Sequence, residues 1–253
     1  RRGNGKDNFG ILRTFYVGGA EQVFSYKDSP LGISSFLSNN SSLEIGGRVY
    51  FERFIDDKKA GAKTDSREGI YFIPAASDDE QPIIVGQSHH YQTTAFSGFV
   101  SENIEFEKFT LNPGLRLEVF EQERVDRLAG SVYQDKSIID LLPGVGFITK
   151  FSTINFFGGI HRGFTPPSSG TLKILNFGGT PEDQGLNLEA EKSWNKEFGV
   201  RGDYSMINFE VSGFHVGIEN LVAAGRGTAF KNLGRVNTMG LELNMNLISS
   251  KLS

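Results

Sequence analysis

Residues 109–119 read FTLNPGLRLEV, and this stretch alternates strictly between two kinds of side chain. Apolar residues hold every odd position, whereas polar residues or glycine hold every even one. Because successive side chains of a strand point to opposite faces, this period predicts a strand with one apolar and one polar face. The same alternation recurs at residues 42–53 and 241–247.

The alternation is compatible with two architectures. In a soluble antiparallel sheet the apolar face covers a core and the polar face meets water. In a membrane barrel the apolar face meets lipid and the polar face lines a lumen. The alternation alone favours the soluble sheet, so the lengths of the connections must decide between the two.

The pattern predicts nine strands joined by connections of alternating length. The strands cover residues 8–17, 42–53, 90–101, 108–119, 141–149, 152–162, 192–203, 206–218 and 234–247. Short connections are expected at 102–107, 150–151 and 204–205, and long or middle-length ones at 54–89, 120–140, 163–191 and 219–233. The first connection, 18–41, is an exception unless the first strand continues through Val23 and Phe24. Short turns at one end and long loops at the other are typical of outer-membrane barrels, and a soluble Greek-key sandwich has no reason to keep them.

The composition agrees with a chain of many strands and excludes several kinds of function. The 253 residues include 31 Gly and 22 Phe, and only 38% are hydrophobic. The formal charge of −4 gives no global basic field for nucleic acid. The absence of Cys excludes disulfides, thiol catalysis and thiolate metal sites. No run of about 18 apolar residues could form a transmembrane helix.

Five motifs, in order between about residues 96 and 243, resemble the TonB-dependent outer-membrane receptors. Residues 188–199 resemble that family's Leu-x-Pro-Glu-x-Ser-x-x-x-Glu-x-Gly strand, with Ala190 in place of Pro. The sequence of residues 161–167, HRGFTPP, is most similar to that of receptors of the ferric-citrate type. The other motifs are 99–103 with 111–118, 142–146 with 156–167, 214–221, and 232–242.

The resemblance implies an all-β fold, an antiparallel up-and-down transmembrane barrel in the bacterial outer membrane. We expect residues 1–253 to be an interior portion, about nine or ten strands of a larger barrel, with long extracellular loops and short periplasmic turns. The plug domain and the C-terminal strands of the family are expected to be absent. The resemblance further implies active transport of a ferric chelate, iron citrate or a siderophore complex, with the TonB protein as partner through the missing plug and outer-membrane lipid around the wall. No cofactor is expected, since the iron(III) chelate is cargo.

Anionic chelates call for cationic and hydrogen-bonding groups that face the lumen near the extracellular mouth. The predicted ends of the strands give six candidates for ligand binding. They are Arg48, Arg53, Arg116, His161, Arg162 and Arg226.

No catalytic or metal site is predicted. Adjacent His89 and His90 point to opposite faces of a strand, which is a poor arrangement for a shared metal. No nucleophile, base and orienting group come together in the sequence, so an enzyme is not expected. Two other functions stay open at this point, a small passive outer-membrane barrel or adhesin and a soluble carbohydrate-binding β-sandwich.

An open sheet leaves unpaired backbone N–H and C=O groups at two edges, and lipid cannot satisfy them. We therefore predict that a polypeptide of residues 1–253 alone does not insert into a membrane as a monomer with its native strand content. Electrophoresis of the inserted polypeptide with and without heating tests this. Heat-modifiable migration together with resistance to urea would contradict the prediction.

Overall fold

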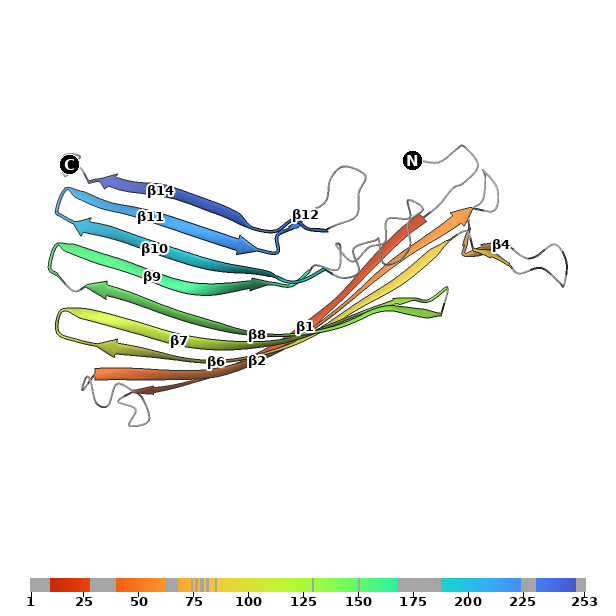
Figure 1. Cartoon of the computed structure of the whole chain (residues 1–253), viewed down its shortest axis with the longest axis horizontal. Helices are drawn as coiled ribbons and strands as arrows, with labels where there is room; N and C mark the ends of the chain where they lie inside the picture. The colour runs from red at the N-terminus through yellow and green to blue at the C-terminus, as the bar shows by residue number, and fades with distance from the viewer. Residues whose placement is uncertain are drawn as a thin grey trace, which may run out of the picture.

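A single antiparallel sheet dominates the computed structural model of the chain (Figure 1). The structure describes residues 10–27, 40–61, 68–73, 75, 77, 80, 82–84, 86–128, 130–149, 151–167, 188–223 and 231–248. The long strands lie in the order β1-β2-β6-β7-β8-β9-β10-β11-β14, so neighbours in the sequence of long strands are neighbours in space. Their bounds are β1 Gly10–Lys27, β2 Asn40–Gly61, β6 Gln87–Glu105, β7 Phe109–Asp126, β8 Ser131–Thr149, β9 Ile154–Thr165, β10 Glu191–Asp203, β11 Ile207–Glu219 and β14 Val236–Leu247.

Five short strands lie at one end of the sheet. They are β3 Gly69–Ile70, which pairs with β2, β4 Phe72–Ile73 with β5 Ile83–Ile84, and β12 Val222–Ala223 with β13 Lys231–Asn232. At the other end, tight turns join the long strands, at 106–108 and at 204–206 among others. In the first of these turns the Phe106 N–H donates to the Phe109 carbonyl at 2.8 Å. Figure 1 shows these turns together at the left of the view.

All nine strands predicted from the alternation are present, and the fold class is confirmed as an all-β antiparallel sheet. The first strand does extend through Val23 and Phe24, and it ends at Lys27. The long connection expected at 120–140 is wrong, because β7 continues to Asp126 and β8 begins at Ser131. Beyond the apolar stretch of β7 most side chains are polar, yet the ladder with β8 continues to the turn, with one shift of register between Arg124 and Val125.

The register sorts the side chains of the whole sheet onto two faces. Val49, Phe96, Val119 and Ile139 are register partners on four successive strands, and they lie on what we call the apolar face. The adjoining row, on the polar face, consists of Arg48, Ser97, Glu118 and Asp140. The alternation therefore holds across strands as well as along them.

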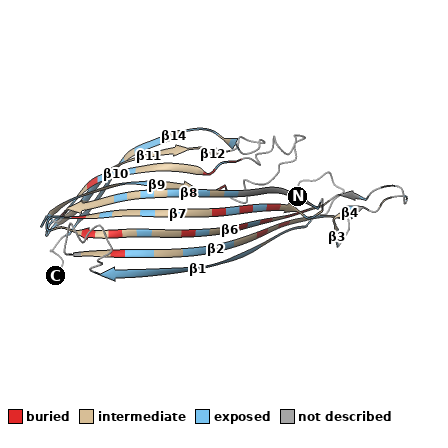
Figure 2. Cartoon of the chain, turned by 60° about the horizontal axis from the view of Figure 1, so that its bottom comes forward, coloured by how far each residue is buried: buried red, intermediate tan, exposed pale blue. Residues whose placement is uncertain are grey.

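The apolar face is exposed on every long strand of the sheet. Phe96 is 50% exposed, Ile139 68% and Leu241 84%. Buried apolar side chains are few among the described residues, and the one cluster they form joins Phe54 and Tyr91. Figure 2 shows this as pale blue and tan along most of the sheet, with red concentrated in β6 and β7. A single layer of this kind needs a nonaqueous environment for its apolar face.

Glycine and phenylalanine face each other across the ladder, which explains why both are abundant. Five such pairs are direct register partners in adjacent strands. They are Gly46–Phe99, Gly158–Phe147, Gly199–Phe157, Gly202–Phe209 and Gly240–Phe214. In each pair a Cβ on the glycine would come within 2.3–2.9 Å of the ring. The rings therefore lie over the glycine backbone instead of standing away from the sheet.

The β8–β9 ladder is the shortest between the long strands. It holds only five register pairs, from Gly144↔His161 to Ile148↔Phe157. The next residue of β8 is Pro143, which has no N–H to donate. Above this point β8 stays with β7, whereas β9 approaches the polar face of β7, where the ring centroids of Phe164 and Phe120 are 6.4 Å apart. Beyond Pro143, on the side away from the short turns, β8 and β9 are no longer paired, and the sheet divides there between these two strands.

The Gly199–Phe157 pair gives a test of this packing in the intact protein. A Cβ at position 199 would lie 2.4 Å from the Phe157 ring, whereas one at Gly47 would meet its nearest atom at 3.7 Å. We expect Gly199→Ala to destabilise the barrel by about 1–3 kcal/mol through overpacking, and Gly47→Ala to have a much smaller effect. The temperature at which heat-modifiable migration is lost measures both. Equal midpoints for the two variants would contradict the proposed contact.

Candidate ligand-binding face

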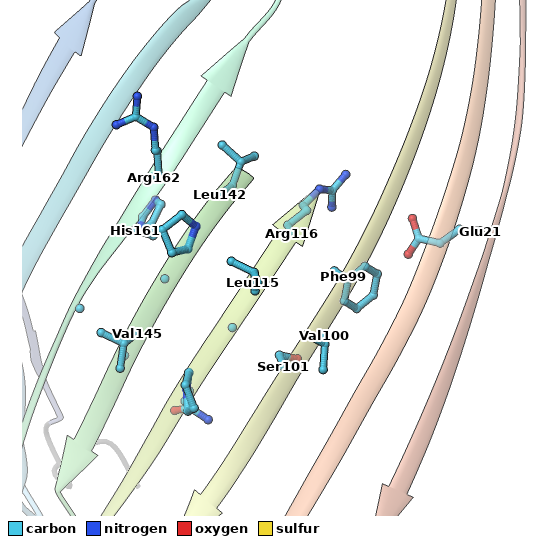
Figure 3. Close-up of a pocket in the computed structure, with 17 residues that line it drawn as sticks. Glu21, Phe99, Val100, Ser101, Leu115, Arg116, Leu142, Val145, His161 and Arg162 are labelled. Atoms are coloured by element: carbon cyan, nitrogen blue, oxygen red, sulfur yellow. The ribbon is translucent and has the colours of Figure 1, made fainter. Parts of the chain in front are cut away.

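The polar face carries the hollows of the sheet. One hollow of about 550 Å³ is lined by β6, β7, β8 and β9 and also by Glu21 of β1 (Figure 3). Only β2 separates Glu21 from the part of the lining that β6 provides. A second hollow of about 480 Å³ adjoins the first, with Asn112 and His161 in the lining of both.

Glycines form the floor of these hollows. Gly114 and Gly144 are register partners, as are Gly146 and Gly159, and all four are on the polar face. The missing side chains leave room for a second layer of polypeptide or a ligand against the backbone. Arg116 and His161 stand in the lining of the first hollow.

A compact polar cluster lies beside the hollow on β2, β6 and β7. Arg116 donates to Glu118 through Nε and to the Ser97 hydroxyl through Nη2, the latter at 2.9 Å. The Ser97 hydroxyl in turn donates to Glu118 at 2.6 Å. Arg48, the register partner of Ser97, is exposed and lies 5.6 Å from the Tyr50 ring centre. These bonds fix the guanidinium of Arg116 while 38% of its side chain stays exposed.

A second polar network, whose side chains are more buried, lies on the polar face farther from the short turns. It is built from two adjacent rows that cross β1, β2, β6 and β7. One row is Arg13, Asp56, His89 and Asp126, and the other is Phe15, Phe54, Tyr91 and Arg124. Both Asp56 and Arg124 are fully buried.

The aromatic row is a continuous stack that ends on a cation. The ring centroids of Phe15 and Phe54 are 4.4 Å apart, and those of Phe54 and Tyr91 are 5.4 Å apart. The Arg124 guanidinium lies 5.6 Å from the Tyr91 ring centre. Burial is the main cause that raises the pKa of Tyr91 to about 12, so its hydroxyl is neutral at physiological pH.

The charged row centres on His89. Arg124 Nη2 lies 3.2 Å from His89 Nδ1, and His89 Nε2 lies 3.3 Å from a carboxylate oxygen of Asp126. A neutral ring satisfies both contacts, since Nδ1 then accepts from the guanidinium and Nε2–H donates to the carboxylate. Burial first, and then the neighbouring Arg124 charge, lower the pKa of His89. At the end of the row, Arg13 Nε donates to Asp56 at 3.2 Å.

The end of β9 covers part of this network. Gln122, one register step from Arg124 on the same face, donates through Nε2 to the Pro167 carbonyl at 2.8 Å. The bond is buried and spans 45 residues of sequence. Lys192 at the start of β10 pairs with Asp140 of β8 at 3.2 Å. The β9–β10 hairpin is therefore fastened to the polar face of β7 and β8 on both of its strands.

The structure separates the six candidate residues predicted from sequence. Arg48, Arg116 and His161 lie on the polar face, and two of them line the first hollow. The alternation places Arg53 and Arg162 on the opposite face from Arg48 and His161, so the expectation that Arg53 faces the lumen is wrong, whereas Arg162 still contributes to the lining of the first hollow. Arg53 is five residues from Arg48, an odd number, and its Nη2 lies 2.9 Å from Nδ1 of His90 instead. Arg162 is adjacent to His161 and is the register partner of Trp194.

Arg226 lies outside the described residues. As ligand-binding residues, all six stay predictions. The network around Arg124 was not predicted from the sequence, because residues 120–140 were expected to form a long connection. The available signal was the alternation of Gln122, Arg124 and Asp126 with Glu121 and Glu123, which continues the period of the strand.

Among the described residues, no group of three or more His, Asp or Glu side chains could hold a metal ion. None of these residues forms a helix of the length and apolarity needed to cross a membrane. The polar face presents guanidinium, imidazole, amide and carboxylate groups.

The sequence of residues 4–250 matches a known family model, described as TonB dependent receptor-like, beta-barrel. The match agrees with the single-layer antiparallel sheet, its exposed apolar face and its hollowed polar face. The chain belongs to this family. The family is one of outer-membrane receptors, so the chain is located in the bacterial outer membrane, with its apolar face toward lipid and its polar face toward the lumen. No curated protein sequence matches it.

Solved structures of receptors share the fold. The ferric citrate transporter FecA, in the unliganded form, aligns over 96% of this chain and 33% of its own, with 20% identity and a TM-score of 0.67. The alcaligin outer-membrane receptor FauA from Bordetella pertussis aligns over 94% and 37%, with 14% identity and a TM-score of 0.61. The copper transporter OprC aligns over 95% and 40%, with 12% identity and a TM-score of 0.57. The chain therefore spans a third to two-fifths of these relatives and is similar to them in fold alone.

The apolar face has the height that a membrane requires. On β7 it runs from Phe109 to Val119. Ten residue steps of about 3.4 Å give about 34 Å along the strand, and a tilt of about 40° reduces this to about 26 Å, close to the ~25 Å band of outer-membrane barrels. Tyr91, His89 and Arg124 lie beyond this band, in the part of the sheet outside the membrane.

The lowered pKa of His89 makes the upper network sensitive to acid. The unfolded chain binds a proton at higher pH than the folded network does, so stability falls as the pH drops below the ordinary histidine value of about 6.5. We expect hydrogen exchange of the upper β6 and β7 amides in the full-length receptor to speed up between pH 7.5 and pH 5, after correction for the intrinsic rates. In His89→Gln this extra acceleration should be smaller. An undiminished pH dependence in His89→Gln would assign the effect to other groups.

Proposed function

We propose that this chain forms part of the wall of a TonB-dependent receptor that takes up a ferric chelate, iron citrate or a siderophore complex, across the outer membrane. The observation that carries the proposal is the set of cationic and hydrogen-bonding groups on the polar face, Arg48, Arg116 and His161, beside the glycine-floored hollow. Guanidinium groups recognise anionic chelates well when neighbouring side chains hold them in place by hydrogen bonds. Glu118 and Ser97 hold Arg116 in this way.

Energy coupling belongs to the same proposal. TonB would act through a plug domain that occupies the lumen, and the polar face offers the contact surface for it. The open hollows over Gly114, Gly144 and Gly159 support this placement, because they leave room for a second polypeptide layer against the wall. The residues of the polar face would then line the transport route, and the cargo would cross it without being chemically changed.

The cargo is the part of the proposal that the fold supports least. FecA and OprC carry ferric citrate and copper, by their names, on similar folds. The resemblance of residues 161–167 to receptors of the ferric-citrate type favours an iron chelate. Competition between ferric citrate, ferric siderophores and copper salts for the purified full-length receptor would rank these cargoes.

Substitutions on the two faces of the sheet test the ligand-binding face, with Arg48 of β2 and Arg116 of β7 on the polar face and Arg53 of β2 on the opposite one. In the full-length receptor we expect Arg48→Gln and Arg116→Gln each to weaken ferric citrate binding by about 10- to 150-fold, because each removes a charge-assisted hydrogen bond of about 1.5–3 kcal/mol. Arg53→Gln makes the same change on the opposite face of β2 and should leave the affinity unchanged. Isothermal titration calorimetry in detergent measures all three.

Two outcomes would count against this assignment. Unchanged affinity in both Arg48→Gln and Arg116→Gln would remove them from the site. A loss in Arg53→Gln as large as in Arg48→Gln would show that the effect comes from the barrel as a whole. Uptake by cells with and without TonB then tests the coupling separately from binding.

A further inference from the structure

The ladder between β8 and β9 ends while both strands still continue. It holds five register pairs and stops at Gly144↔His161, although β9 remains a strand to Thr165 and β8 begins at Ser131. The ladders of β7 with β8 and of β9 with β10 hold 18 and 12 pairs. Figure 1 shows β7 and β8 continuing together to the right of the view, whereas β9 ends well before them. Beyond the fork, the facing edges of β8 and β9 are not paired with each other.

The unpaired edge of β8 lies partly at the height of the membrane. The register with β7 places Leu141 beside Leu117, within the apolar band. A backbone N–H in this layer needs a partner from the protein. The Leu141 N–H finds one in the preceding side chain, since it donates to Oδ1 of Asp140 at 3.1 Å. A carboxylate thus takes the place of a neighbouring strand at this position.

Three contacts, which we call the latch, hold the end of β9 and the start of β10 on the polar face of β7 and β8. They are the ring pair Phe120–Phe164 with centroids 6.4 Å apart, the hydrogen bond from Gln122 Nε2 to the Pro167 carbonyl at 2.8 Å, and the ion pair of Lys192 with Asp140 at 3.2 Å. The hydrogen bond is buried, and the Asp140 side chain is only 10% exposed. Asp140 takes part twice, because Oδ2 meets Lys192 while Oδ1 accepts from Leu141.

The backbone offers the same strand a second set of partners. If the register of the short ladder continued, Leu142 would face Gly163 and Leu141 would face Phe164. Both strands are already extended there, so this pairing needs no refolding of either one. It would exchange the latch for further ladder hydrogen bonds and give Leu141 a strand partner. The two arrangements exclude each other, since Phe164 cannot lie on Phe120 of β7 and beside Leu141 of β8 at once.

The fork lies at a position that suits a hinge. Pro143 has no N–H, so the ladder lacks one bond there in either arrangement. On β9, Gly159 and Gly163 stand on either side of His161 and restrict the backbone least. Pro143, Gly144 and His161 also line the first hollow. A change of pairing at the fork would therefore change the shape of this hollow.

We propose that the end of β9, residues 163–167, and the start of β10 form a hinged strap with two alternative sets of partners, the latch and the unpaired edge of β8. An element with two exclusive packings shifts between them when a few contacts on one side change. The structure holds the latched arrangement. In the other one the strap leaves the polar face of β7 and uncovers Gln122. The proposal concerns the wall alone and does not depend on the cargo.

The test measures the position of the strap in the full-length receptor in detergent by double electron–electron resonance. Spin labels are attached at Thr94→Cys on β6 and Thr165→Cys at the end of β9, which are both exposed and outside the latch. Residues 1–253 contain no Cys, and any Cys elsewhere in the receptor is first replaced by Ser. Moving the strap from β7 to the edge of β8 displaces its label by two strand spacings, about 10 Å, away from β6.

We expect one main distance in the labelled receptor and a longer one whose population grows about 5- to 10-fold in Gln122→Met, because this change leaves the buried Pro167 carbonyl without its donor. Asp140→Asn removes the charge that faces Lys192 and should increase the longer population less. Gln92→Met replaces an exposed glutamine of β6 and should match the unchanged receptor. Heat-modifiable migration checks that each variant is folded. A single distance that neither Gln122→Met nor Asp140→Asn moves would overturn the proposal, as would an equal shift in Gln92→Met.

Discussion

Backbone hydrogen bonding in a solvent that offers no partners is the constraint on which this structure depends. Inside the hydrocarbon layer every N–H and C=O must be satisfied by the protein. Except at the outer edges of β1 and β14, the described strands meet this requirement by pairing with their neighbours in sequence over ladders of up to 19 register pairs. Once the ladder is fixed, the pleat sends alternate side chains to lipid and to lumen, and both surfaces follow from one backbone arrangement.

This constraint also changes what packing means in the molecule. There is no interior between two layers, so apolar side chains stabilise the sheet through lipid on one side and through neighbours in the same layer. The Gly–Phe pairs are the local form of that packing, since a ring that lies over a glycine covers backbone without a second layer. Beyond the membrane the ladder continues, but the faces change: Glu121 and Glu123 replace Leu115 and Leu117 on one side, and the Arg124 network fills the other.

The existence and the faces of the strands could be predicted from sequence because both depend only on a period of two. The boundaries could not, since the period loses its apolar half above the membrane, where residues 120–126 still pair with β6 and β8. The orientation of Arg53 and Arg162 was available in principle from their odd separation from Arg48 and His161. The row Arg13, Asp56, His89 and Asp126 was not available, because it unites four strands through a register that no single strand encodes.

The same geometry separates two kinds of recognition on one wall. A side chain on the lumen face and its neighbour in sequence on the lipid face are in contact with different phases, as Glu118 and Val119 illustrate. Cargo can therefore vary by substitutions at lumen positions without disturbing the membrane fit, which agrees with a ferric citrate transporter and a copper transporter on similar folds. The reverse also holds, because lipid-facing residues can adapt to the surrounding leaflet without entering the transport route. The alternation of the strand is what keeps the two surfaces apart.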